Sequence, residues 1–185
     1  MKIAVVIGHE ENSPGAVNEK TDVSEFEFFR KVAHDIEHNF TDYNMVDEIS
    51  VVYRETNYQE LPGQLNELGL DLIVSLHANA FNTEVEGCET LYYHKSVKSK
   101  KIAQIFQDKL WVLLANKNRG ILPRTSEDRG GYLLRYTKAP CVLCEPFFID
   151  NDADYLFAEK MFHDGELTRV YCEAINEAIE YLRGI

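Results

Sequence analysis

Short apolar runs alternate with longer amphipathic segments along this chain of 185 residues, and this alternation constrains its fold most strongly. The run Lys2–Ile7 is apolar after its first residue and is followed at once by Gly8, which is typical of a strand covered on both faces. Strands that alternate with helices favour an α/β fold, with a mainly parallel or mixed central sheet and helices on both faces. A chain of this length is expected to form a single domain, residues 1–185.

The same patterns predict where the individual elements lie. Apolar runs predict the strands Lys2–Ile7, Glu48–Arg54, Leu70–Leu76, Gly87–Tyr93 and Cys141–Glu145. Amphipathic segments predict helices from about Ser24 to Phe40, and over Tyr58–Leu68, Lys95–Asn116, Asp152–Phe162 and Leu167–Leu182. Two polar segments that contain glycine and proline, residues 8–23 and 117–132, are expected to be loops.

The charge of the chain excludes some classes of partner. Its 19 Lys and Arg against 31 Asp and Glu give a net charge of −12. This acidic balance argues against nucleic acid, because such binding is driven by Lys and Arg that neutralise phosphates. It argues equally against an anionic membrane surface. No apolar run approaches the roughly 18 residues needed to span a bilayer, so membrane insertion is not expected.

The chain has four cysteines, too few for a disulfide framework at this length. Cys141 and Cys144 form a C-x-x-C, but they lie in a predicted strand, where residues three apart point to opposite faces. A zinc ribbon would need a second such pair, which the sequence lacks. We therefore expect plain thiols in or near the core.

Three predicted strands end at a side chain that can take part in chemistry. His9 follows the first strand, His77 follows the third, and Glu145 ends the fifth. In open α/β sheets, the ligand crevice lies outside the carboxyl ends of the strands. If these strands are parallel, His9, His77 and Glu145 meet at one edge of the sheet.

A fourth candidate, Glu25, lies in the first turn of the helix that begins near Ser24. Projected at about 100° per residue, Glu25 falls on the same apolar stripe as Phe29 and Ile36, and Glu27 lies nearly opposite. A charged carboxylate on a buried face is costly unless it is paired or binds a metal. The alternative is that Glu25 sits at a frayed helix start and reaches water.

The same helix carries a second, less favoured metal motif. Residues 34–38 match H-x-x-E-H, the pattern of an inverted zinc protease helix. In the helical projection, however, His34 and His38 point roughly 140–180° away from the apolar stripe. We therefore expect both histidines in solvent.

Two imidazoles and one carboxylate with an open fourth position make up the His₂Glu type of catalytic zinc site. We predict one zinc ion per chain on His9, Glu25 and His77. Such a site lowers the pKa of a bound water to about 7 and polarises a carbonyl. Amide hydrolysis also needs a group that takes the water proton and passes it to the leaving nitrogen, and Glu145 fits this role.

Two motifs around these residues are specific when they occur together. They are the S-x-H-x-N-A segment around His77 and the P-x-V-L-x-E segment that ends at Glu145. The sequence resembles the zinc-dependent N-acetylmuramoyl-L-alanine amidases of the amidase-3 type, found in bacterial autolysins and phage endolysins. The matching segments follow the family order over Ile3–His9, Ser24–Phe28, Asp71–Ala80, Gly87–Tyr93, Asn118–Gly120 and Leu133–Asn151.

The resemblance implies zinc on His9, Glu25 and His77, with Glu145 as the catalytic glutamate. It also implies peptidoglycan as the partner and hydrolysis of the amide between the lactyl group of N-acetylmuramic acid and L-alanine. The sequence departs from the family around the ligands, for example at Phe29, where an asparagine is common.

Substrate contacts are predicted at Asn79, Arg119 and Arg129. Arginines of the segment 117–132, Arg124 among them, could meet the carboxylates of a stem peptide. The alternative is that they are solvated loop arginines.

The N-terminal apolar run is too short for a signal peptide and lacks a small-residue cleavage site. We therefore expect a chain made in the cytoplasm that acts on the cell wall after release, or a domain of a longer exported protein. Two other functions stay open: a zinc hydrolase that cuts inside the stem peptide, and a non-catalytic wall-binding protein on the same fold.

Overall fold

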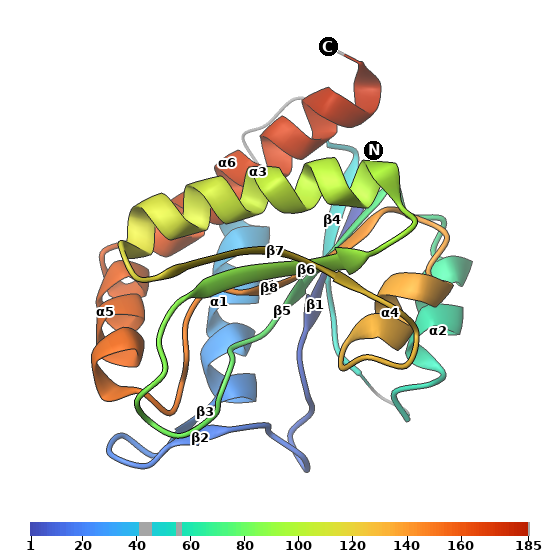
Figure 1. Ribbon diagram of the computed structural model, residues 1–185. Coiled ribbons are helices and arrows are strands. Elements are labelled where there is room, and N and C mark those ends of the chain that lie inside the picture. Colours follow the sequence, from blue (N-terminus) through green and yellow to red (C-terminus); the bar gives the residue numbers. More distant parts are fainter. Residues whose placement is uncertain (41–45, 55–56, 185) are drawn as a thin grey trace.

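A six-stranded sheet with helices on both faces forms the centre of the computed structural model, which describes residues 1–40, 46–54 and 57–184 (Figure 1). The first four strands in spatial order run parallel, and the last two are antiparallel to them. This mixed sheet confirms the predicted α/β fold. In spatial order the strands are β4 (Glu48–Val52), β1 (Lys2–Ile7), β5 (Leu72–Leu76), β8 (Cys141–Glu145), β6 (Cys88–Tyr93) and β7 (Asn118–Arg124).

The two faces of the sheet are covered unequally. Alternate residues of β1 show the division, because Val5 packs into the larger core and Val6 into the smaller one. The smaller core lies under two short helices, α2 (Leu61–Glu67) and α4 (Gly131–Tyr136) (Figure 1). The larger core is covered by α1 (Glu25–Asn39), α3 (Val97–Leu114), α5 (Asp152–His163) and α6 (Glu166–Arg183).

The prediction that residues 117–132 form a loop is wrong for most of the segment. Residues 118–124 form β7, which pairs with β6 at the edge of the sheet. Pro123 and Gly120 suggested a loop, but an edge strand tolerates proline, because one side of its backbone needs no partner. Gly131 then begins the short helix α4, whose six residues are too few for a clear helical pattern.

Two further predictions are wrong in part. The helix predicted from Tyr58 begins only at Leu61, because Pro62 lies in its first turn, where proline is favoured. The predicted loop 8–23 contains a small antiparallel pair, β2 (Val17–Asn18) and β3 (Val23–Ser24). Between β2 and β3, the side-chain oxygen of Asn18 accepts hydrogen bonds from the backbone N–H groups of Lys20 and Thr21, which stabilise the turn. The other predicted strands and helices are present with slightly different ends.

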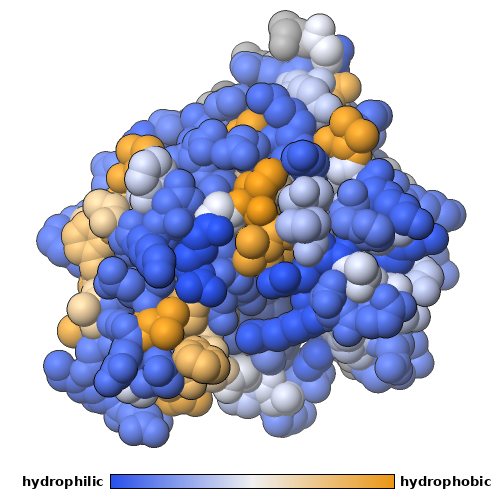
Figure 2. Space-filling view, in the orientation of Figure 1, coloured by the Kyte–Doolittle hydropathy of each residue, from blue (hydrophilic) through white to orange (hydrophobic). Residues whose placement is uncertain are grey.

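The cysteines are plain buried thiols, as predicted. Cys141 lies in the smaller core and Cys144 in the larger one, so the two sulfurs point to opposite faces of β8. Figure 2 shows a face that is mainly hydrophilic with small hydrophobic patches. In the part of the chain that the structure describes, no helix is long and apolar enough to cross a membrane.

Candidate metal centre

Both histidines lie at one edge of the sheet, because β1 and β5 are adjacent, parallel and end there. His9 follows Gly8 at the end of β1, and His77 follows β5 directly. The backbone N–H of Gly8 donates to Leu76 O, and that of His77 donates to Cys144 O, each at 2.9 Å. Only glycine fits at position 8, since an added Cβ would lie 2.5 Å from the His77 ring. The two imidazole rings therefore meet edge to face, with centroids 5.5 Å apart.

The loop after β1 folds closely over this pair. His9 has a φ of 67°, in the left-handed region that residues other than glycine rarely adopt. Strained backbone of this kind often lies at functional sites. Gly15, with a φ of 81°, passes so near that an added Cβ would lie 2.8 Å from both Glu25 Oε2 and His9 Cδ2.

Helix α1 carries Glu25 to the same place through the cap at its N-terminus. Ser24 is the N-cap: its hydroxyl accepts from Glu27 N at 3.2 Å, and Glu27 Oε2 accepts from Ser24 N at 3.0 Å. This capping box fixes the first turn, so that Glu27 faces solvent and Glu25 faces the sheet with 1% exposure. The predicted burial of Glu25 is confirmed, and the frayed alternative is wrong.

The three side chains form a compact cluster of possible metal ligands. Glu25 Oε1 accepts from Ala78 N at 3.0 Å and lies 2.9 Å from His77 Nδ1, and its Oε2 lies 3.2 Å from His9 Nε2. One ligand atom from each of the three residues lies within 4.8 Å of the other two. Burial would raise the pKa of Glu25, but the adjacent His77 and His9 hold it at about 2, so the carboxylate is ionised.

Glu145 ends β8 at the same edge of the sheet and is 3% exposed. Burial raises the pKa of Glu145 to about 8, against the lowering effect of the Arg129 charge and together with a further rise from Glu89. A carboxyl group with a pKa near neutrality is suited to both accept and return a proton.

A cavity of about 180 Å³ joins Glu145 to the two histidines. It lies on the thinly covered face, under α2 and α4, and its apolar walls include Leu61, Leu91 and Leu133. Its polar walls are His9, Arg54, Tyr58, Ser75, His77, Arg129 and Glu145. The cavity gives a small molecule access to His9, His77 and Glu145.

The predicted substrate contacts lie in two settings. Arg129 lines the cavity, has a 62% exposed side chain and lies 3.8 Å from Glu145. Asn79 and Arg119 instead contact Glu89, a 2% exposed residue of β6 that the sequence interpretation missed. The sequence feature that could have identified Glu89 is a carboxylate inside a predicted strand, at a position that lies on the same face of the strand as Leu91.

The H-x-x-E-H motif does not form a metal site. His34 and His38 are exposed on α1, as predicted, and His34 contacts Tyr53 and Glu37. Among the residues described by the structure, the cluster of His9, Glu25 and His77 is the group of three that could hold a metal ion.

Known proteins resemble this chain along most of its length. A family model described as N-acetylmuramoyl-L-alanine amidase matches residues 3–180. The structure of such an amidase from Clostridium difficile 630 has a TM-score of 0.82 at 20% identity, covering 97% of this chain and 96% of that one, which shows a shared fold. The catalytic domain of the CD27L endolysin, which targets Clostridia difficile, gives a TM-score of 0.79 at 28% identity over 96% of this chain and 97% of that one.

A shorter match links the chain to a larger protein. The N-acetylmuramoyl-L-alanine amidase LytC of Bacillus subtilis is 33% identical over 87 residues. This match covers 45% of the present chain and 16% of LytC. Since the family model extends from β1 to α6 and includes His9, Glu25, His77 and Glu145, the chain belongs to the amidase-3 family of N-acetylmuramoyl-L-alanine amidases.

Proposed function

We propose that this chain hydrolyses the amide between the lactyl group of N-acetylmuramic acid and L-alanine in peptidoglycan, with one zinc ion held by His9, Glu25 and His77. The observation that carries the proposal is the compact cluster of these three residues, with Glu145 on the same cavity. The family to which the chain belongs supports the choice of substrate. In this proposal the chain acts at the bacterial cell wall.

The residues of the cluster fit a zinc ion. Two imidazoles and one carboxylate are the ligands of one common type of catalytic zinc site. Glu25 Oε2 is buried and lies 3.2 Å from His9 Nε2, but among the described residues no donor makes a well-aligned hydrogen bond to it, and an oxygen placed in this way is suited to a cation. A zinc ion held there would polarise the amide carbonyl and lower the pKa of a water molecule.

Glu145 supplies the proton transfer in this proposal. It takes a proton from the attacking water and passes it to the nitrogen of L-alanine as the C–N bond breaks. Its burial keeps solvent from competing for that proton, and its raised pKa makes both steps accessible near neutral pH.

We assign substrate binding to the cationic side chain of Arg129. Its guanidinium lines the cavity and remains largely exposed, so a carboxylate of the stem peptide can reach it. The substrate roles of Asn79 and Arg119 stay predictions, because both side chains already contact a buried carboxylate.

Zinc analysis of paired variants tests the ligand assignment. Glu25→Ala should lose zinc, whereas Glu27→Ala should keep it, because that variant loses only the Glu27 side-chain half of the capping box and retains the Ser24 cap. His77→Ala should likewise lose zinc, and His34→Ala should keep it. Zinc retained by Glu25→Ala and His77→Ala would exclude the proposed centre, as would full wild-type hydrolysis in excess chelator.

A further inference from the structure

Two buried carboxylates face each other across neighbouring strands. Glu89 of β6 lies directly opposite Glu145 of β8 in the antiparallel register, and the two residues are 2% and 3% exposed. Two ionised carboxylates at directly opposed positions would destabilise a sheet, and burial would make this arrangement more costly. The pair therefore requires specific partners that hold it in place.

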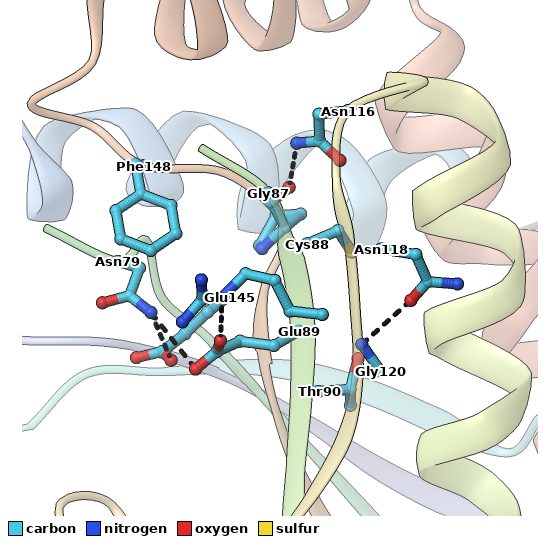
Figure 3. Close-up of polar contacts among 12 residues, drawn as sticks. Asn79, Gly87, Cys88, Glu89, Thr90, Asn116, Asn118, Gly120, Glu145 and Phe148 are labelled. Carbon is cyan, nitrogen blue, oxygen red and sulfur yellow. Dashed lines mark hydrogen bonds and ion pairs between the residues drawn. The ribbon is translucent and has the colours of Figure 1, made fainter. Parts of the chain in front are cut away.

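The carboxamide of Asn79 bridges the two carboxylates. Its Nδ2 donates to Glu89 Oε1 at 3.2 Å and to Glu145 Oε2 at 3.4 Å, and Figure 3 shows the side chain pointing at both. The bridge itself is held firmly. Asn79 N donates to Phe147 O at 2.9 Å, and Asn79 Oδ1 accepts from Ala80 N at 3.0 Å. These two contacts fix the Asn79 backbone and its carboxamide oxygen, and the Nδ2 hydrogens are directed by the carboxylates that accept from them.

A bulge in the sheet directs Arg119 onto the other side of Glu89. Cys88 pairs with Asn118, but the next residue of β6, Glu89, pairs with Gly120, so Arg119 is the extra residue of β7. Bulges re-aim a side chain and are common beside active sites. Gly120 has a φ of 79°, and its N–H donates to Asn118 Oδ1 at 2.9 Å. Figure 3 draws this hydrogen bond between the two residues.

Two contacts hold the guanidinium group of Arg119. Arg119 Nε donates to Glu89 Oε2, and its guanidinium carbon lies 5.1 Å from the centre of the Phe148 ring. Arg124 lies further from the same carboxylate, at 3.8 Å. Glu89 is thereby anchored by a charge-assisted hydrogen bond, which is stronger than a neutral one.

We propose that Glu89 is a positioning residue for Glu145: anchored by Arg119, it orients the Asn79 carboxamide that holds the Glu145 carboxylate toward the cavity. The proposal rests on the function proposed above, in which Glu145 moves the proton. Arg129 cannot supply the same constraint, because it approaches Glu145 from an exposed segment at 3.8 Å. Glu145 is instead held by the half-buried Asn79, which also donates to the buried Glu89.

The first test is the kinetics of Glu89→Gln on a soluble N-acetylmuramoyl-L-alanyl peptide. This variant keeps the shape of the side chain but removes the charge that anchors Arg119. We expect kcat to fall about 10- to 100-fold, as for other residues that orient a catalytic group, with KM and zinc content unchanged. Glu86→Gln removes an exposed carboxylate three positions away and should retain wild-type kcat.

A double variant shows whether Glu89 acts through Glu145. If it does, Glu145→Gln and Glu89→Gln/Glu145→Gln should have the same residual rate, because the group being positioned is already gone. Arg119→Gln tests the anchor independently, because loss of the hydrogen bond to Glu89 should lower kcat and leave KM unchanged. A raised KM in Arg119→Gln would instead make Arg119 a substrate contact and overturn the anchor.

Failure of this proposal is distinguishable from failure of the proposed function. With an active wild type, an unchanged kcat in Glu89→Gln, or an additive loss in the double variant, overturns the positioning role alone. A Glu89→Gln protein that does not fold would mean that the charge is needed for structure, and an unchanged kcat in Arg119→Gln would then overturn the role. A wild type that does not hydrolyse the amide removes both proposals.

Discussion

Glu145→Gln should lower the rate of amide hydrolysis about 10²- to 10⁴-fold, the usual contribution of a general acid–base group. This loss corresponds to roughly 2.7–5.4 kcal/mol of transition-state stabilisation, at 1.36 kcal/mol per tenfold. Glutamine keeps the size of the side chain and can still accept the hydrogen bond from Asn79 Nδ2. Because Glu145 lies outside the cluster of His9, Glu25 and His77, the variant should bind zinc as the wild type does.

The same substitution should stabilise the metal-free protein at alkaline pH. Burial raises the pKa of Glu145 from its ordinary value of 4.5 to about 8. Since the folded carboxyl keeps its proton to a higher pH than the unfolded one, the wild type loses stability as the pH rises through this window. The shift corresponds to several kcal/mol at about 1.36 kcal/mol per unit. Glu145→Gln avoids this loss.

Three measurements on each protein separate these effects: initial rates on a soluble N-acetylmuramoyl-L-alanyl peptide, zinc content, and urea unfolding after chelation at about pH 5 and pH 9. The variant should resemble the wild type in stability at the lower pH and exceed it at the higher one. Near-normal hydrolysis would remove Glu145 as the base. Loss of zinc would instead make it a ligand and reopen the role of Glu25.

Other substitutions probe the surroundings of the site. Gly15→Ala should weaken zinc binding in a chelator competition assay, because the added Cβ would lie too close to Glu25. Gly63→Ala is the control, since an added Cβ there meets nothing within 4 Å, and equal zinc affinities in the two variants would refute the close approach at Gly15. Ser24→Ala should lower the stability by about 1 kcal/mol through loss of the cap, and an unchanged Tm would contradict this. Arg129→Gln should raise KM and move the acid limb of the pH–rate profile upward, because Arg129 lowers the pKa of Glu145; an unchanged KM would exclude Arg129 as a substrate contact.

The residues of the cluster and Glu145 could be predicted because each one follows from local geometry. His9, His77 and Glu145 stand at the ends of apolar runs, and parallel strands bring such ends to one edge. Glu25 follows from the helical projection, since about half a helical turn separates the buried stripe from the solvated face. These inferences need only the number of residues per turn of a helix and the direction in which each strand runs.

The pairing of Glu89 with Glu145 could not be predicted, because it depends on the order of strands in the sheet. β6 lies beside β8 and runs against it, although 47 positions separate Tyr93 from Cys141 and nothing in their sequences specifies the neighbour. The edge strand β7 was hidden by Gly120 and Pro123 for a related reason. Whether such residues end a strand depends on whether their unpaired side faces solvent, which is a property of the sheet.

The bond that is cut tests the central claim most directly. Purified peptidoglycan should be digested with the zinc-loaded protein, and the products identified by mass spectrometry. We predict released peptides with a new amino terminus at L-alanine, together with uncut glycan chains whose lactyl groups end in free carboxylates. New termini inside the stem peptide would make the protein a peptidase of another specificity. No released peptide at all, with the protein bound to the wall and zinc present, would make it a binding protein and contradict the account.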